Sequence, residues 1–231
     1  MKRFYKKTSV AAAEGGFAVL LDGKPIRTPT KARFAVPGCA LAEAIAAEWQ
    51  AQGEEFNPAE LHLTRLAGTA IDLVAPRRAQ IVAEIANYAG TDLLCYRAGE
   101  PPELAARQLG TWQPLLDWAA SRYAKLAVTQ GVSPVAQDPK ILRAYEAAVA
   151  DYDSMQLAAL YLATSALGSL VLALALIEGR IDADAAFAAA QLDEDFQIER
   201  WGLEDEAAKR RAALQDDIRL AARFAALHRD A

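Results

Sequence analysis

The pattern of apolar and polar positions predicts a β-rich beginning followed by helices. Residues 17–21 are a short apolar run, an Asp-Gly pair follows, and residues 24–27 resume an extended pattern. Asp-Gly between two such runs is a strong signal for a two-residue hairpin. Residues 33–36 alternate between polar and apolar positions and predict a third strand. We therefore expect a small antiparallel sheet within the first forty residues.

From residue 40 onward the apolar positions recur with the period of a helix. Residues 40–52 are rich in alanine and place Leu41, Ile45 and Trp49 four residues apart, which is one helical face. Residues 91–97 are expected to form a short apolar strand or an extended link. Further helix starts are indicated by caps or by proline in the first turn. These starts are Asn57-Pro58, Pro102, Asp138-Pro139 and Asp182.

The turn-forming sequence at residues 99–102, Gly-Glu-Pro-Pro, is the best candidate for a domain boundary. It predicts an N-terminal domain over residues 1–98, with a β-rich start followed by helices. It also predicts an α-helical C-terminal domain over residues 99–231. The expected fold class is α+β, with a small antiparallel sheet ahead of a larger all-α domain.

Residues 157–177 require a choice between a membrane span and a buried helix. The segment has 21 residues and no charge, which is long enough to cross a bilayer. It is nevertheless rich in weakly hydrophobic alanine, glycine, serine and threonine, and its near flanks are acidic. A helix that is apolar on all sides can equally be the centre of a helical domain. We expect a buried helix and no stable membrane insertion.

Composition and charge narrow the function classes. The 231 residues include 53 alanines, which inflates the apolar share, and the net charge is −5. An acidic chain is a poor general binder of nucleic acid. The two widely spaced cysteines, Cys39 and Cys95, provide neither a disulfide framework nor a zinc site, and two histidines are too few for most imidazole-based catalysis. Because the common nucleotide, zinc-hydrolase and α/β-hydrolase motifs are also missing, we expect no cofactor and no metal.

An acidic cluster lies between residues 193 and 206. It consists of Asp193, Glu194 and Asp195, followed after Trp201-Gly202 by Glu204, Asp205 and Glu206. The first interpretation is a solvated helix start, with Asp205 paired to Lys209 and Glu206 to Arg210. The second is an acidic contact surface for a protein partner. A metal or catalytic carboxylate site is the third, and it lacks the Glu-x-x-His motif of helical di-metal proteins.

Two further sets of residues are candidates for contacts. Trp112, Trp118 and Trp201 could anchor either the core or an interface, and we favour the core for each. Arg65, Thr69 and Asp72 fall near one face of a predicted helix. They would form either an internal polar network between two domains or a site for a partner or ligand.

An ordered set of short segments runs through almost the whole chain. The segments are RFYK at 3–6, LDGKP at 21–25, TP at 28–29, EW at 48–49, LTRL at 63–66, TAID at 69–72, Tyr88, TDLLCYR at 91–97, WQPLL at 112–116, SLV at 169–171, FQ at 196–197 and WG at 201–202. In this set, although in no single segment, the chain resembles the assembly chaperones for the α subunit of F-type ATP synthase.

The resemblance implies a non-enzymatic chaperone that holds the newly made α subunit until the β subunit replaces it. It also implies an acidic functional position after the Trp-Gly pair, as Trp-Gly-x-x-Glu. An ungapped count reaches Asp205, which Glu204 and Glu206 flank, so all three are carried as contact candidates. The candidate contact residues taken together are Glu204, Asp205, Glu206, Trp201, Asp195, Arg65 and Asp72.

The start of the chain and the proposed role lead to expectations about location and assembly. The start Met-Lys-Arg-Phe favours a bacterial, cytoplasmic protein, and a eukaryotic source would imply the mitochondrial matrix. A chaperone for one subunit could work as a monomer. The competing functions are a helical small-molecule-binding protein or enzyme with a carboxylate site around residues 193–206, and a membrane-attached protein.

Overall fold

The computed structural model describes residues 2–131 and 133–229, which form two compact units. Unit 1 contains the described residues up to Arg78, together with Asp153–Ala159 and those from Arg223 onward. Unit 2 contains Ala79–Tyr152 and Leu160–Ala222. A small antiparallel sheet followed by helices confirms the α+β prediction. The domain boundary after residue 98 stays a prediction.

The sheet of unit 1 has the order β1-β2-β3, with strands Thr8–Ala13, Gly16–Leu21 and Lys24–Pro25. The turn between β2 and β3 places Asp22 at φ 48° and Gly23 at φ 81°. Positive φ at both central residues gives the backbone twist that favours a tight hairpin, and Asp-Gly tolerates it. The predicted hairpin is therefore confirmed.

The prediction of a third strand at residues 33–36 is wrong. This segment makes two isolated bridges, Arg27 with Arg33 and Phe17 with Val36, and no continuous ladder. The close approach of Val36 explains the glycine at position 16. A Cβ on Gly16 would lie 2.2 Å from the carbonyl oxygen of Val36.

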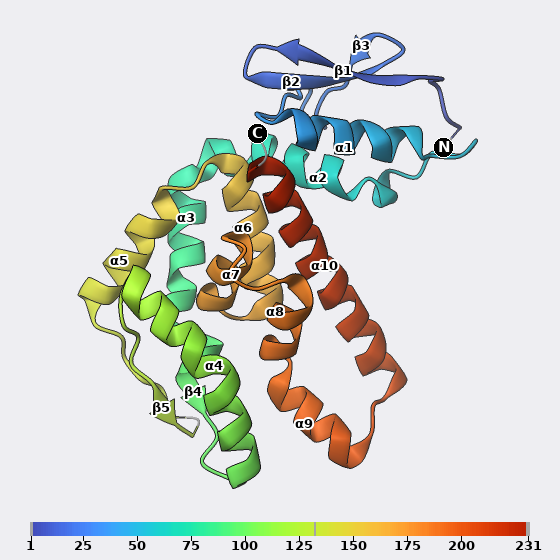
Figure 1. Cartoon of the computed structure of the whole chain (residues 1–231). Coiled ribbons are helices and arrows are strands. Elements are labelled where there is room, and N and C mark those ends of the chain that lie inside the picture. Colours follow the sequence, from blue (N-terminus) through green and yellow to red (C-terminus); the bar gives the residue numbers. More distant parts are fainter. Residues whose placement is uncertain (1, 132, 230–231) are drawn as a thin grey trace. The chain divides into compact units, whose positions relative to one another are not determined.

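The core of unit 1 lies between the sheet and helix α1 (Cys39–Gln50), which Figure 1 shows beneath the strands. The alanine-rich face predicted for residues 40–52 is confirmed, because Leu41, Ile45 and Trp49 are all buried. Helix α2 (His62–Thr69) packs against α1. It begins after a 3₁₀ turn, Pro58–Glu60, whose cap Asn57 accepts a hydrogen bond from the Ala59 amide.

After α2 the helical path widens into a π-helical segment, Ala70–Val74, before the 3₁₀ turn Ala75–Arg77 and α3 (Arg78–Asn87). Proline at position 76 has no amide hydrogen and cannot donate to the fourth carbonyl back. The Ala75 amide bonds to the Ala70 carbonyl, five residues back. π-segments inside helices are frequent at functional sites.

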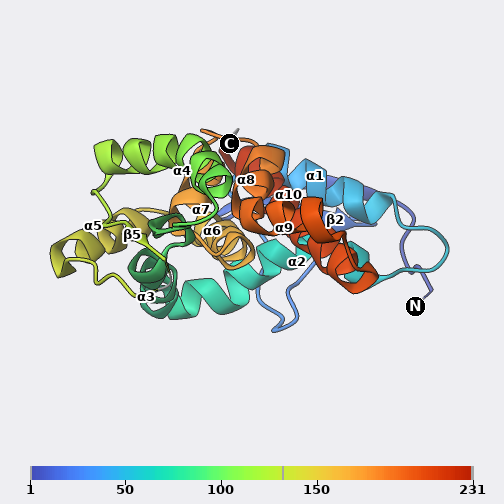
Figure 2. The ribbon, with the colours of Figure 1, turned by 90° about the horizontal axis from the view of Figure 1, so that it is seen from below.

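Unit 2 is a helical assembly around α7 (Leu170–Ile177). Figures 1 and 2 show α7 among its neighbours, and it packs against α4 (Pro102–Arg122), α8 (Ala183–Ala190) and the 3₁₀ turn Tyr88–Thr91. The predicted caps are confirmed, because Asp138 and Asp182 each accept a hydrogen bond from the first turn of the following helix. Besides α3 and the turn Tyr88–Thr91, unit 2 contains these elements, of which α6 and α10 are shared with unit 1: 3₁₀ turn Leu93–Cys95, β4 (Tyr96–Arg97), α4 (Pro102–Arg122), β5 (Thr129–Gln130), α5 (Pro139–Ala150), α6 (Ser154–Leu167), α7 (Leu170–Ile177), α8 (Ala183–Ala190), α9 (Leu192–Trp201) and α10 (Asp205–Arg229).

Two expectations about helical segments need correction. Residues 91–97 are mostly 3₁₀ turns, and the strand is limited to Tyr96–Arg97, which pairs in parallel with β5. The apolar segment 157–177 is not one helix. It breaks at Gly168, which adopts φ 63°, and Ser169 caps the new helix α7. Among the described residues, none of the helices combines the length and apolarity needed to span a membrane.

The break in the apolar segment is held by Asp92, which is completely buried. Its carboxylate accepts hydrogen bonds from the Ser169 hydroxyl at 2.7 Å and from the Val171 amide at 3.0 Å. The Leu94 amide donates to the same carboxylate at 3.0 Å. Asp92 therefore satisfies backbone donors at the start of α7 and in its own turn, which makes it a structural residue.

Candidate protein-interaction sites

The seven predicted contact residues fall into two places. Asp195 lies at the start of α9, and Trp201, Glu204, Asp205 and Glu206 lie where α9 ends and α10 begins, all in unit 2. Arg65 and Asp72 belong to the α2 region of unit 1.

The acidic turn, defined as residues 201–206, is exposed at every position. Helix α9 ends because Gly202 takes φ 84°, a left-handed conformation that side chains disfavour. Asp205 and Glu206 lie in the first turn of α10, where negative charge complements the helix dipole. The turn therefore presents carboxylates to solvent at a well-defined helix start.

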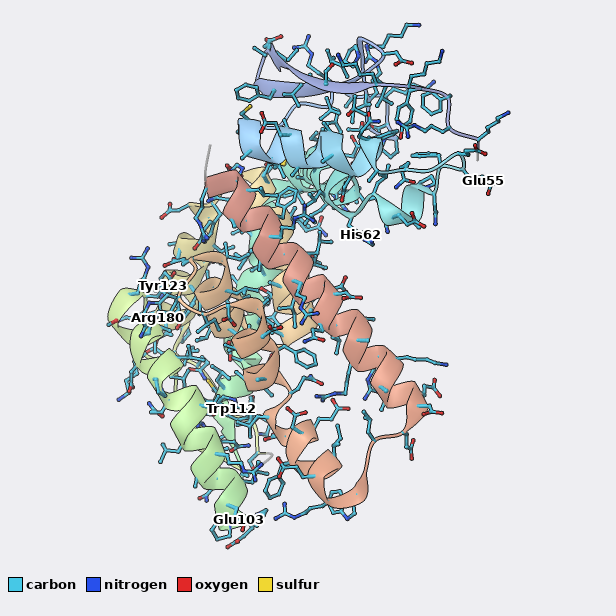
Figure 3. All side chains as sticks on the ribbon, turned by 45° about the vertical axis from the view of Figure 1, so that its right-hand side comes forward. Glu55, His62, Glu103, Trp112, Tyr123 and Arg180 are labelled. Carbon is cyan, nitrogen blue, oxygen red and sulfur yellow. The ribbon has the colours of Figure 1, made fainter. Side chains whose placement is uncertain are left out.

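The structure overturns two expectations about the acidic turn. Trp201 is 77% exposed, so the prediction that it packs in the core is wrong. The same prediction is confirmed for Trp112, which is fully buried and whose indole N–H donates to the Ala189 carbonyl at 2.8 Å. Figure 3 labels Trp112 on α4. Arg210 pairs with Glu194 at 3.1 Å rather than with Glu206. Among the described residues, no salt bridge involves the carboxylates of the acidic turn.

The acids at the start of α9 are occupied by partners. Asp195 forms an ion pair with Arg211, which also lies 3.4 Å from Glu194. Asp193 accepts a hydrogen bond from the Gln108 amide at 2.7 Å. These bonds tie α9 to α10 and to α4, so Asp195 has a structural partner, and its role as a contact residue stays a prediction.

Helix α9 is also fastened to the beginning of α4 by exposed ion pairs. Arg200 lies 2.9 Å from Glu103, which Figure 3 labels near the start of α4, and Arg107 lies 2.7 Å from Glu199. Exposed pairs of this kind contribute little stability individually. By contrast, within the described part of the chain the carboxylates of the acidic turn make no ion pair.

Arg65, Thr69 and Asp72 line one groove in unit 1, although they make no mutual hydrogen bond among the contacts of the described residues. Asp72 accepts hydrogen bonds from the Thr30 hydroxyl at 2.7 Å and the Thr30 amide at 3.2 Å. Desolvation alone would raise the pKa of Asp72, but hydrogen bonds from Thr30 and Thr28 outweigh it and lower that pKa. The Asp72 carboxylate is thus held as an anion that anchors the loop carrying Thr30.

The α2 groove, as we name this cavity of about 560 Å³, also has lining residues that sequence reasoning missed. Most come from the segment after β3 and from α1, so they are distant from α2 in sequence. Gly68, inside α2, was the one local signal, because glycine is unfavourable in a helix interior. The missed lining residues are Arg27, Thr28, Pro29, Thr30, Phe34, Trp49, Pro58, Leu61, Thr64, Gly68 and Leu73.

The carboxylate site considered around residues 193–206 finds no support in the geometry. Asp193, Glu194 and Asp195 are held by Gln108 and two arginines, and the acids of the acidic turn face solvent. No group of three or more histidine, cysteine, aspartate or glutamate side chains within residues 2–131 and 133–229 is placed to hold a metal ion.

An exposed tryptophan, carboxylates that lack ion pairs among the described residues, and an apolar groove are features typical of protein-binding surfaces. The family model for the ATP12 chaperone protein matches residues 2–120, and the chain belongs to this family. It is thus a chaperone of ATP synthase assembly, as its resemblance indicated.

Known relatives agree with this assignment over nearly the whole chain. The crystal structure of Atp12 from Paracoccus denitrificans is 46% identical, covers 98% of each chain and has a TM-score of 0.95. A mutant of P. denitrificans Atp12p, with lysine in place of an aspartate, is 45% identical and also gives a TM-score of 0.95, covering 98% of this chain and 97% of its own. The mitochondrial protein atp12 of Schizosaccharomyces pombe is 24% identical over 88% of this chain and 75% of its own length.

Proposed function

We propose that the chain binds the unassembled α subunit of F-type ATP synthase, prevents its aggregation and promotes its assembly with β. The observation that carries this proposal is the acidic turn, where Trp201 is 77% and Leu203 46% exposed beside three carboxylates that lack ion pairs among the described residues. A large aromatic side chain and flanking charge are a typical combination for a binding surface. In this proposal the chain acts without catalysis and as a monomer.

The physical task explains why such a surface is suitable. An isolated α subunit would expose apolar surface that its β neighbours normally cover, and such surfaces self-associate. A chaperone must release its client, so a modest and partly polar interface fits the role. Carboxylates at its edge would speed the encounter with a basic patch and disfavour wrong partners. We place this exchange in the cytoplasm of a bacterium or in the mitochondrial matrix.

The direct test is size-exclusion chromatography with light scattering on a mixture of this protein and isolated α subunit. We expect a soluble complex with α and none with isolated β, which serves as the partner control. Light scattering from α alone should rise on standing and stay low when the protein is added. Two unshifted peaks, with α still competent to bind β, would contradict the proposal.

The role of the acidic turn is tested by the double variant Glu204→Lys and Asp205→Lys. We expect titration calorimetry to show at least tenfold weaker binding to α, with an unchanged circular dichroism spectrum. The matched control is Glu146→Lys with Asp216→Lys, which makes the same charge change at exposed positions of the same unit. Equal binding by the two double variants would contradict the assignment of the acidic turn.

Charge reversal is compatible with this fold in a relative. The P. denitrificans mutant, with lysine in place of an aspartate, superposes on this chain with a TM-score of 0.95. Loss of binding in the double variant can therefore be separated from loss of structure.

A further inference from the structure

The α2 groove combines a buried apolar floor with an exposed apolar rim. Phe34, Trp49 and Leu61 form the floor and are buried, while Leu73 on the rim is 47% exposed. A volume of about 560 Å³ lies within the range of cavities that hold ligands or anchoring side chains. The exposed Leu73 would be covered by a chain that continues beyond the cavity, so the shape suits a peptide segment.

Gly68 is the strongest sign that the groove is kept open. It lies inside α2, is buried and lines the cavity, yet a Cβ built on it would meet no atom within 4 Å. Neither a left-handed φ nor a crowded neighbour requires glycine at this position. A helix interior normally favours alanine over glycine, so the cost in helix propensity has no local compensation. Departures from local rules of this kind concentrate at functional sites.

The charges around the groove favour an acidic occupant. The Arg27 guanidinium donates to the Lys31 carbonyl at 3.0 Å, and the Arg65 guanidinium donates to the Ala59 carbonyl at 3.3 Å. Across the described ranges, neither arginine pairs with a carboxylate. The acid that lines the groove, Asp72, is already engaged by Thr30. Two exposed guanidinium groups therefore retain donors for a carboxylate of a partner.

We propose that the α2 groove binds an extended segment of the ATP synthase subunit that this protein chaperones, in which a bulky apolar side chain neighbours a carboxylate. The apolar side chain fills the cavity over Gly68, and the carboxylate pairs with Arg65 or Arg27. This inference rests on the proposed function, because the client supplies the segment. The groove would be a second contact site. It would bind an acidic part of the client, whereas the acidic turn would bind a basic part.

The experiment compares two glycine-to-leucine variants of the full chain. Gly68→Leu fills the groove, whereas Gly110→Leu makes the same change in the interior of α4, also at a glycine whose Cβ would meet nothing within 4 Å. The probes are the isolated α subunit and overlapping 15-residue synthetic peptides spanning α and, as a control, β. Binding is measured by titration calorimetry, and folding by circular dichroism.

We expect wild type and Gly110→Leu to bind α equally, and Gly68→Leu to bind at least tenfold more weakly. The peptides that bind wild type should contain a large apolar residue within a few positions of aspartate or glutamate. Arg65→Glu, an exposed change that leaves the cavity intact, should weaken those same peptides and favour versions in which lysine replaces the acid. Arg65→Glu also provides the test if Gly68→Leu fails to fold.

The outcomes separate this inference from the function on which it rests. If wild type binds α while folded Gly68→Leu and Arg65→Glu bind it and the peptides as tightly as wild type, the groove assignment is wrong and the chaperone function stands. If wild type binds neither α nor any peptide, the proposed function and the groove assignment both fail. Selective loss in the two groove variants, with Gly110→Leu unaffected, supports both.

Discussion

Two regions of unit 2 contain carboxylates in contrasting environments. One is the Asp92 cluster, which we define as Asp92 with its donors Leu94, Ser169 and Val171, and the other is the acidic turn. Asp92 is completely buried and accepts hydrogen bonds from Ser169, Val171 and Leu94. Asp205 and its neighbours are exposed and, within the described chain, lack salt bridges. Both regions lie at the start of a helix, where negative charge is favourable, so residue type and local position do not distinguish them.

The difference shows that the environment decides what a carboxylate contributes. Burial raises the pKa of Asp92, although its hydrogen bonds act in the opposite direction. A buried carboxyl group destabilises the fold unless it is hydrogen-bonded, so Asp92 depends on the donors around it. An exposed carboxylate keeps its hydration and contributes little to stability, but it remains available to a partner. We therefore assign the Asp92 cluster to folding and the acidic turn to binding.

The largest effect should follow from Asp92→Ala. It leaves the amides of Leu94 and Val171 without their buried acceptor, at about 1–3 kcal/mol for each donor. We expect a loss of about 3–5 kcal/mol in the free energy of unfolding, measured by urea denaturation. A loss below about 1 kcal/mol would show that the cluster is not structural and would remove the contrast with the acidic turn.

An intermediate effect is expected for Asp153, which heads α6 and lies in unit 1. Its carboxylate is 2.7 Å from Nε2 of His228 and accepts the Gln156 amide at 2.9 Å, with its side chain 49% exposed. Desolvation raises the pKa of Asp153, but the hydrogen bonds from His228 and the Gln156 amide lower this pKa by more. The net pKa therefore lies below its ordinary value. The stability that this carboxylate contributes is therefore present above about pH 4 and is lost as the pH falls through the lowered pKa.

The variant Asp153→Asn should flatten that acid dependence. We expect unfolding by urea to show a difference of no more than about 1 kcal/mol at neutral pH, because solvent screens the half-exposed side chain. The difference between variant and wild type should shrink below about pH 4. A difference that grows as the pH falls would reverse the sign of the inferred pKa shift.

The smallest effect on stability should come from the acidic turn. The double variant Glu204→Lys and Asp205→Lys removes two exposed acids near the start of α10, where the expected change is within about 0.5 kcal/mol at physiological salt. Thermal unfolding measures this change beside the calorimetric loss of α binding. If the variant were strongly destabilised instead, the acidic turn would belong with Asp92 as a folding element.

Local sequence features were sufficient for much of the fold. Asp-Gly predicted the β2–β3 hairpin, the spacing of Leu41, Ile45 and Trp49 predicted α1, and the caps Asp138 and Asp182 predicted two further helix starts. Each signal acts within a few residues, so the chain needs no distant partner to express it. The resemblance named the acidic region after Trp201-Gly202, and the structure shows that region exposed.

Other features depended on distant residues and were predicted wrongly or missed. The segment 157–177 reads as one apolar helix, but its break at Gly168 is held by Asp92, far earlier in the chain. Trp201 resembles a core residue by type, but it lies at the end of α9 with 77% of its surface exposed. The α2 groove needs Arg27, Phe34 and Trp49 beside α2, which no local pattern specifies.

The sequence by itself determined the class of fold, the positions of most helix starts and the absence of common catalytic motifs. These follow from periodicity, capping and composition, which are properties of neighbouring residues. The tertiary structure alone decided which acids are buried, which tryptophan is exposed and where a hollow remains over Gly68. Burial, hydrogen-bond satisfaction and cavity shape depend on residues far apart in the chain, and only packing brings these together.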